Sequence, residues 1–264
     1  PPYAEVSSVG LKGKAGVNQS KIHTQYSSQL SGAGRELFAQ FLIRITSEIK
    51  GSIVGEFSTL KIFNGSAFKV FRNTYDAILL GGFIAPAYTF DNVKGKFPIG
   101  FKIWKTSEKQ ISDTIQVDIY NDKAEFIGVK GFYIAHEKNH YINNWISSYK
   151  TDSEFIGFLA GTNGNDFQQN AIVYLLNKKD QMANPRGVWV SLKNIIQVSI
   201  YFAVRKNINH HWTLHNDQFL FPKDNWNEDL EFQNDCLTFI LFHEKNNIQS
   251  QVSTNYWIPF TEQE

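Results

Sequence analysis

The clearest periodic patterns of the sequence are the stretch Arg35-Glu-Leu-Phe-Ala-Gln-Phe-Leu-Ile-Arg-Ile-Thr-Ser-Glu-Ile49 and the segment Ser52-Ile-Val-Gly-Glu-Phe-Ser-Thr-Leu60 that follows it. Apolar side chains in the first stretch recur every three or four residues, which predicts an amphipathic helix ending near Gly51. The apolar positions of this helix are Leu37, Phe38, Phe41, Leu42, Ile45 and Ile49. The second segment is typical of a buried strand, so the pattern indicates a helix followed directly by a strand of an α/β protein.

Residues 66–75 continue this α/β pattern. They predict a short helix with Ser66 as its cap. Residues 78–90 and 97–105 each predict a strand, and the polar link between them is short and contains Gly95. Such a link favours antiparallel pairing. The sequence therefore predicts the second half of an α/β sheet, with an antiparallel strand pair at its edge.

Beyond residue 106 the pattern changes to a mixed α+β type. Strands are predicted at 114–120, 126–135 and 155–160, a short helix around Trp145, and longer helices at 192–208 and 228–243. Loops are predicted at 9–31, 161–165 and 178–186. We therefore divide the chain into residues 1–106 and 107–264.

Composition limits the classes of protein to which the chain can belong. With 264 residues, 42% of them hydrophobic, the chain can bury a substantial core. The formal net charge is only +1, so any contact with nucleic acid must use local patches. Cys236 is the single cysteine, the first residues form no hydrophobic leader, and no apolar run approaches the length of a membrane span. These features predict a cytoplasmic protein without a membrane segment.

The first three residues and the elements behind them resemble a known family. Pro1-Pro2-Tyr3 resembles the end of the Asn-Pro-Pro-Tyr motif of amino-methyltransferases, and the order of predicted elements resembles the amino-terminal-cofactor (gamma-like) class of DNA adenine-N6 methyltransferases. Phe41-Leu42 and Phe71-Arg72 match short blocks of that family, and residues 90–101 are similar to its strand pair in large restriction-modification enzymes. Later similar blocks are Tyr201-Phe-Ala-Val-Arg205, Asp217-Gln-Phe-Leu-Phe-Pro222, Glu231-Phe-Gln-Asn-Asp-Cys236 and Trp257-Ile-Pro-Phe260.

The resemblance implies a second half of a Rossmann-like methyltransferase sheet in residues 1–106 and a target-recognition, DNA-binding region in 107–264. In the family, the Asn and the first Pro carbonyl accept hydrogen bonds from the adenine amine, whose lone pair is otherwise delocalised into the ring. Pro1 takes the carbonyl role here, Pro2 keeps the backbone rigid, and Tyr3 stacks on the flipped base. The Asn would stand immediately before Pro1.

Further site residues also come from the resemblance. The family places an aromatic ring at the strand pair against the target base, which assigns this role to Phe90 first and to Phe97 second. The lysines of the amino-terminal loop are expected to contact DNA phosphates; they are Lys12, Lys14 and Lys21. By default, however, such rings are core residues and such lysines belong to a solvated loop.

The implied cofactor is S-adenosyl-L-methionine. Its Gly-rich motif lies upstream of the catalytic motif in the family, and Gly10, Gly13 and Gly16 do not replace it because no strand precedes them. We therefore expect the cofactor-binding half to lie outside this chain, and the chain alone to be inactive. The implied partners are double-stranded DNA with a flipped adenine, the missing upstream half in the same or another chain, and a companion or fused restriction nuclease, all in a bacterial cytoplasm.

Two other classes of function stay open at this point. One is a non-catalytic DNA-binding module that keeps a degenerate methyltransferase fold, and the other is a structural or protein-interaction domain in which the opening tripeptide is accidental. A metal site is not expected, because His210, His211 and His215 lack the acidic residue of a His-Glu-x-x-His signature. Cys236 lies on the apolar side of a predicted helix and is expected to belong to the core.

Overall fold

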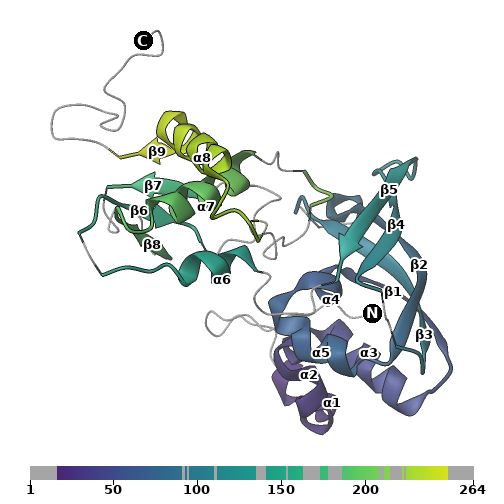
Figure 1. Ribbon diagram of the computed structural model, residues 1–264. Coiled ribbons are helices and arrows are strands. Elements are labelled where there is room, and N and C mark those ends of the chain that lie inside the picture. Colours follow the sequence, from purple (N-terminus) through teal and green to yellow (C-terminus); the bar gives the residue numbers. More distant parts are fainter. Residues whose placement is uncertain are drawn as a thin grey trace. The chain divides into compact units, whose positions relative to one another are not determined.

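The computed structural model in Figure 1 contains two compact units, which we describe one at a time. The first unit is Pro1–Lys138 with Trp212–Asn216, and the second is Asn139–His211 with Asp217–Glu264. The structure describes residues 17–90, 93, 95–109, 112–134, 141–152, 154–162, 173–177, 186–207, 211–214, 222 and 224–248.

The described part of the first unit begins with short helical elements, and further helices lie between its strands. They are η1 (Val17–Gln19), α1 (Lys21–Gln25), α2 (Ser27–Leu30), η2 (Ser31–Arg35), α3 (Leu37–Glu48), α4 (Lys61–Asn64), η3 (Ser66–Phe68), α5 (Lys69–Thr74) and η4 (Ala87–Thr89). The predicted loop at 9–31 is therefore wrong from residue 17 onward. The Ser20 side chain accepts a hydrogen bond from the His23 amide at 2.9 Å, which caps α1. Lys21 is thus the first residue of a helix.

Helix α3 confirms the strongest sequence prediction, but its buried face differs from the predicted one. The buried residues are Phe38, Ala39, Gln40, Leu42, Ile43 and Thr46. Phe41 is 45% exposed, and Ile49, the C-cap, is also exposed. The helix is apolar over more than the stripe that packs against the core, so its periodicity could not select the buried side. The predicted cap Ser66 is also wrong, since Gly65 is the N-cap of η3 and no side chain caps it.

Five strands form the sheet of the first unit. They are β1 (Ile53–Thr59), β2 (Ala77–Pro86), β3 (Pro98–Thr106), β4 (Thr114–Tyr120) and β5 (Phe126–Tyr133). Their order is β1-β3-β2-β4-β5. β3 is antiparallel to both β1 and β2, β2 is parallel to β4, and β5 is antiparallel to β4. The predicted antiparallel pair β2/β3 is confirmed, but its predicted position at the edge is wrong, because β3 lies between β1 and β2 and β4 pairs with the other side of β2. The sheet is a mixed one in an α/β unit.

The observed division of the chain differs from the predicted division at residue 107. Strands β4 and β5 continue the sheet of the first unit through the parallel pairing of Phe83 and Ile84 with Asp118 and Ile119. A boundary between β3 and β4 would therefore cut one sheet in two. The segment from Trp212 returns to this unit as well, because Trp212 packs against its core and Lys130 Nζ donates to the Thr213 carbonyl at 3.0 Å.

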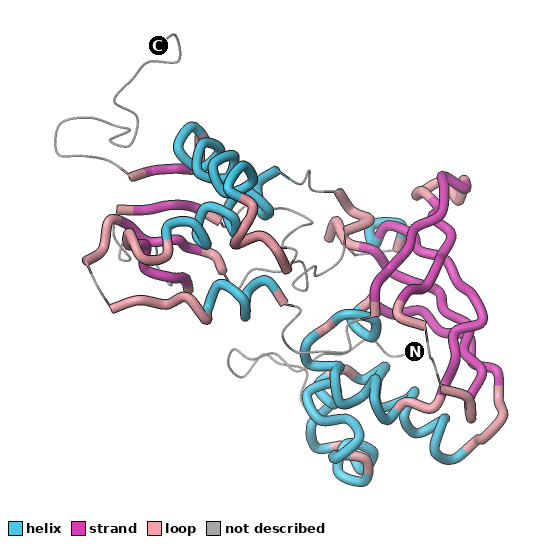
Figure 2. The backbone as a smooth tube through the Cα atoms, in the orientation of Figure 1, coloured by secondary structure: helices cyan, strands magenta, loops and turns pink. Residues whose placement is uncertain are grey.

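One face of this sheet is packed against the helices, as Figure 2 shows for the first unit. Leu60, Ile84 and Trp104 meet the helix residues Phe63 and Phe71 in one buried cluster. Burial of large side chains such as these contributes about 1.5–3 kcal/mol each relative to exposure. The helices therefore form a single layer over one side of the sheet.

The second unit is a smaller α+β structure, as the sequence predicts. Its elements are α6 (Ile142–Ser147), β6 (Gly157–Ala160), β7 (Tyr174–Leu176), β8 (Gly187–Val190), α7 (Ile195–Asn207), α8 (Leu230–Phe242) and β9 (Asn246–Asn247). The strand order is β8-β6-β7-β9, with only β7 and β9 parallel. The predicted helices at α6, α7 and α8 and the strand β6 are confirmed. Strands β7, β8 and β9 were not predicted.

The core of the second unit contains both apolar and polar side chains. Arg205 is fully buried, and its Nη1 donates to the Tyr201 hydroxyl at 3.1 Å, which itself donates to Asn143 Oδ1 at 2.8 Å. Burial raises the pKa of Tyr201 well above its usual value, so this hydroxyl stays protonated. Cys236 is buried on α8, which confirms its predicted core position. None of the described helices has the length and hydropathy needed to cross a bilayer.

Candidate functional site

The predicted base-stacking residues lie at one end of the strands in the first unit's sheet. Because β1, β2 and β4 run in the same direction, their carboxyl ends meet at this end, where open α/β sheets bind their ligands. Phe90 follows β2 as the C-cap of η4. Phe97 precedes β3, and its carbonyl accepts a hydrogen bond from the Ala87 amide at 2.8 Å. Both side chains are partly exposed, so the structure brings the two residues to the same end of the strands.

Phe90 is also the first member of an aromatic row that crosses the sheet. The row consists of Phe90, Phe57, Phe101, Phe83, Tyr120 and Phe126, which come from the β2–β3 link and all five strands. Ring centroids are 5.7 Å apart for Phe90 and Phe57 and 4.8 Å apart for Phe57 and Phe101. Next along the row, the Phe83 ring lies 5.5 Å from Phe101 and 5.4 Å from Tyr120. These separations are those of favourable edge-to-face and tilted contacts.

Strand register explains the row. Phe57 pairs with Phe101, and Phe101 pairs with Phe83, so the three rings point to the same face of the sheet. A side chain at Gly82 would place its Cβ 2.4 Å from the Phe101 carbonyl oxygen, so glycine permits the close approach of β2 and β3 beside the row. None of the six rings belongs to the buried core cluster of this unit.

The aromatic row lies on the face opposite the helices, which we call the bare face. Ile53, at the start of β1, is 68% exposed, and Val129 and Tyr133 on β5 are exposed as well. Among the described strands, β1 pairs with β3 alone, so its other edge has no strand partner within the described residues. Exposed apolar surface next to such an edge is typical of a surface that another element covers.

A buried ion pair lies on the opposite, helix-covered face. Lys102 on β3 is 1% exposed and Glu56 on β1 is 7% exposed, and Lys102 Nζ is 3.2 Å from Glu56 Oε1. The same ammonium group donates to the Ser58 hydroxyl at 2.9 Å and to the Gly100 carbonyl at 3.1 Å. Burial lowers the pKa of Lys102, and the Glu56 carboxylate opposes that change. The pair is fully enclosed and therefore has a structural role.

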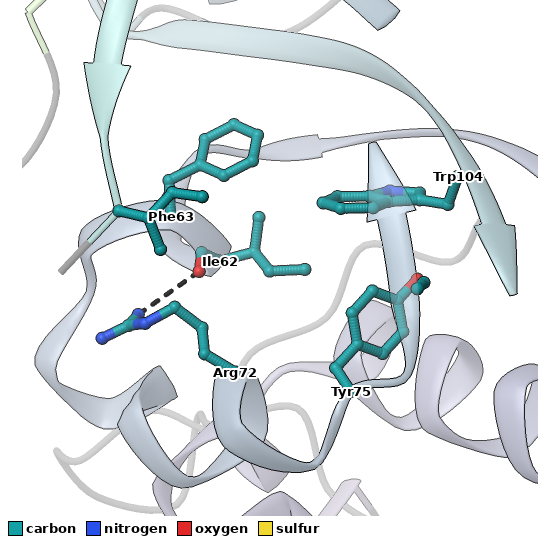
Figure 3. A pocket seen from close by; sticks show the side chains of 7 residues that line it. Ile62, Phe63, Arg72, Tyr75 and Trp104 are labelled. Carbon is teal, nitrogen blue, oxygen red and sulfur yellow. Dashed lines mark hydrogen bonds between the residues drawn. The ribbon is translucent and has the colours of Figure 1, made fainter. Parts of the chain in front are cut away.

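A small cavity of about 40 Å³ lies between α4, α5 and β3 (Figure 3). Its lining residues are Ile62, Phe63, Arg72, Tyr75, Ala77, Trp104 and Ile134. Arg72 Nη1 donates to the carbonyls of Ile62 at 3.3 Å and Gly65 at 2.9 Å, so the Phe-Arg block stabilises the turn between the two helices. A cavity of this size has room for water but is far smaller than small-molecule sites, which measure about 300–1,000 Å³.

The side chain of Gln40 fixes the backbone at Val17, the first residue that the structure describes. Its Nε2 donates to the Val17 carbonyl at 2.8 Å and to the Gly34 carbonyl at 2.7 Å, and its Oε1 accepts from Ser20 at 2.6 Å. Because Gln40 is almost fully buried, these bonds satisfy groups that would otherwise lose water without compensation. Through Gln40, helix α3 thus fixes Val17, which follows Lys12 and Lys14 of the predicted amino-terminal loop.

The catalytic prediction at Pro1, Pro2 and Tyr3 lies outside the described residues, as do Lys12 and Lys14. Lys21 is exposed on α1. Of the row, the sequence singles out only Phe90 as a predicted base-stacking residue, and the other five rings were missed. The missed signal was the alternation of rings with polar residues, as at Phe57 between Glu56 and Ser58.

Among the described residues, no group of three His, Cys, Asp or Glu side chains is placed to hold a metal ion. Of the three histidines in the predicted cluster, only His211 falls within these residues. Comparison of the chain with protein-family models, curated proteins and solved structures finds no match. The function must therefore be inferred from the geometry of the chain.

Proposed function

We propose that this chain is the carboxy-terminal part of an S-adenosylmethionine-dependent DNA adenine-N6 methyltransferase of a restriction-modification system. Its first unit is the second half of a Rossmann-like catalytic domain, and its second unit contacts DNA. The observation that carries the proposal is the position of Phe90. Phe90 lies at the carboxyl ends of β1, β2 and β4, which run in the same direction. It follows β2, which pairs with the antiparallel strand β3.

The order of elements supports the same assignment. The resemblance implies an amphipathic helix, a strand, a short helix and an antiparallel strand pair after the Pro-Pro-Tyr motif. The described chain contains α3, β1, α5 and the pair β2/β3 in this order.

The bare face supports a missing upstream half. Among the described residues, helices cover one face of this sheet, and β1 has an edge without a strand partner. Ile49, the C-cap of α3, and Ile53 of β1 are exposed beside the connection from the helix to the strand, and Phe41 is exposed on α3. Another α/β half that adds a strand to β1 and covers the aromatic row would bury these surfaces.

The proposed reaction transfers a methyl group to the N6 atom of a flipped adenine. The N6 lone pair forms the new bond to carbon, the carbon–sulfur bond of the donor breaks with its electrons on sulfur, and N6 releases one proton. The bound cofactor supplies the activated methyl group. The Pro1 carbonyl accepts a hydrogen bond from the amine, and Tyr3 and Phe90 hold the base by stacking.

A methyl-transfer assay with labelled cofactor and mixed-sequence duplex DNA tests the proposal. It compares this chain with a chain extended upstream by about one half-domain. We expect transfer only by the extended chain. In that chain, Phe90→Ala is expected to lower kcat/KM by about 5- to 150-fold, the equivalent of about 1–3 kcal/mol of base stacking. Phe90→Trp should retain most of the activity because it retains a ring.

Tyr88→Ala is the matched control, since Tyr88 is an exposed aromatic residue two positions from Phe90. It is expected to leave kcat/KM within about twofold of the unchanged protein. DNA binding by the extended chain without any methyl transfer would contradict the enzyme and assign the non-catalytic DNA-binding module. Absence of DNA binding by both chains would contradict the enzyme and the DNA-binding module alike.

A further inference from the structure

The turn between α8 and β9 contains a histidine that acts as a hydrogen-bond acceptor. His243 is the C-cap of α8, and its Nδ1 accepts a hydrogen bond from the Lys245 amide at 3.0 Å. The His243 carbonyl accepts a second hydrogen bond, at 2.9 Å, from the amide of Asn246, the first residue of β9. His243 therefore closes the turn that leads from the helix into the last strand of the described sheet of the second unit.

Two other described turns have the same hydrogen bond but use asparagine as its acceptor. The Oδ1 atom of Asn121 accepts from the Lys123 amide at 2.9 Å. The Oδ1 atom of Asn246 accepts from the Ile248 amide at 3.2 Å. In each turn, a δ atom of the side chain accepts from the amide two residues later. An asparagine oxygen remains an acceptor over the whole physiological pH range, whereas a proton removes the acceptor lone pair of a histidine nitrogen in the acidic range. The turn at His243 is therefore the titratable version of a common turn.

The imidazole ring of His243 packs against the core of this unit. Its centroid lies 5.1 Å from that of the Phe202 ring, which is fully buried on α7, and 5.1 Å from that of the Phe239 ring on α8. Removal from water disfavours the charged imidazolium, so burial lowers the pKa of His243 below its ordinary value. The ring is therefore neutral at neutral pH, and its proton is on Nε2 because Nδ1 is the acceptor.

Charged groups from α7 and from the turn itself also act on this ring. After burial, the largest effect is that of Lys206 on α7, which lowers the pKa of His243, while Glu244 raises it and Lys245 lowers it. Glu244 also forms an ion pair with Lys245 at 3.0 Å. Tyr174, the titratable side chain of β7, lies against the two lysines. The described charges thus act in the same direction as burial.

We propose that His243 is a pH-sensitive latch, which holds β9 against β7 while its ring is neutral and releases β9 when Nδ1 is protonated. A proton from solvent occupies the Nδ1 lone pair, so the N–H groups of His243 and Lys245 then face each other and the hydrogen bond breaks. The Lys245 carbonyl accepts from the Leu175 amide at 3.1 Å, next to the pairing of Leu175 with Asn246. Opening of the turn therefore loosens the backbone bond at which β9 joins the sheet. The latch does not depend on the proposed methyl transfer.

Other contacts of the turn do not titrate, and they limit the release to a local opening. Asn246 Nδ2 donates to the Ile240 carbonyl at 3.0 Å, and Ile248 is buried in the core. In the opened turn the His243 ring is exposed to water, where its pKa is about 6.5. Because the pKa in the closed turn is lower, the closed form loses stability as pH falls through about 6.5 and keeps all of it at higher pH.

Amide hydrogen exchange of the full chain, followed by NMR from about pH 7.5 to about pH 5, tests the latch. After correction for the intrinsic exchange rate, the protection factor of the Leu175 amide is expected to fall by up to about tenfold for each pH unit below about 6.5. His243→Asn should remove this dependence, because Oδ1 keeps the acceptor and does not titrate. His23→Asn, at a histidine of the first unit, is the matched control and should leave the dependence unchanged.

Three outcomes would overturn the latch. The first is a Leu175 protection factor that stays constant with pH in the unchanged protein, and the second is an equal fall in His243→Asn. The third needs no variant, because the nitrogen-15 signal of His243 reports the position of its proton. We expect an unprotonated Nδ1 at neutral pH, and a proton on Nδ1 at that pH would contradict the acceptor role. The methyl-transfer assay measures none of these quantities, so the latch and the proposed function fail separately.

Discussion

At the middle of β1 and β3, the two faces of the first unit's sheet carry the reverse of the usual residues, although the covered face is mainly apolar elsewhere. On β1 and β3, the cross-strand pair Glu56 and Lys102 is charged and lies under the helices, whereas the next pair, Phe57 and Phe101, is aromatic and lies on the bare face. In a half-solvated sheet the apolar side chains normally point to the core and the polar ones to water. This part of the sheet therefore has an apolar row on the face that the described helices leave open.

The two faces also contribute differently to specificity. A buried ion pair contributes little net stability, because desolvation offsets the attraction between its charges, but it strongly disfavours any register that separates the two groups. A row of rings contributes contact area and tolerates small shifts. The covered face therefore specifies the strand register, and the bare face presents an apolar surface.

The largest expected effect comes from breaking the buried pair. Lys102→Met leaves the Glu56 carboxylate buried without its cation and is expected to lower the free energy of unfolding by about 3–5 kcal/mol. The double variant Glu56→Leu/Lys102→Met should recover most of this loss. Lys105→Met, at an exposed lysine on the same strand, is the matched control. Urea unfolding measures all three, and a loss below about 1 kcal/mol for Lys102→Met would contradict the structural role of the pair.

A smaller effect on the free energy of unfolding is expected when a phenylalanine is replaced by alanine on either face of the sheet. Phe63→Ala, on the covered side, should cost about 3–5 kcal/mol, whereas Phe57→Ala, in the half-exposed row, should cost about 1–2 kcal/mol in this chain alone. Urea unfolding of the upstream-extended chain then sharpens the comparison. There the cost of Phe57→Ala should approach that of Phe63→Ala because the row becomes buried. An unchanged cost in the extended chain would show that the upstream half does not cover the row.

The smallest effect is expected in the turn that joins β4 to β5. Ala124 has a φ of 62°, in the left-handed region that favours glycine. Ala124→Gly is expected to raise the free energy of unfolding by about 0.5–1 kcal/mol, because the relieved strain exceeds the entropy that glycine adds to the unfolded chain. The midpoint of urea unfolding measures this gain. A loss of stability would mean that the surrounding turn, held by Asn121, already compensates for the strain.

The predicted elements agree with the structure wherever a periodic pattern is long. Helices α3, α7 and α8 and strands β1, β3 and β4 were predicted within a few residues of their bounds. Phe90 and, as second choice, Phe97 were predicted for one position at the strand pair, and the structure brings both to the same end of the strands. The buried side of α3, the cap of η3 and the division of the chain were wrong. Each depends on packing partners that are distant in sequence.

The sequence by itself determined the type and approximate position of the long elements, because periods of 3.6 and 2 residues are properties of neighbouring positions. Only the tertiary structure decided that β3 lies between β1 and β2, that β4 and β5 extend this sheet, and that Phe57, Phe83 and Phe101 form one row. It also decided that Lys206 and Lys245 meet at Tyr174. The physical reason is that pairing register and packing between distant segments are cooperative, so no local window of sequence contains them.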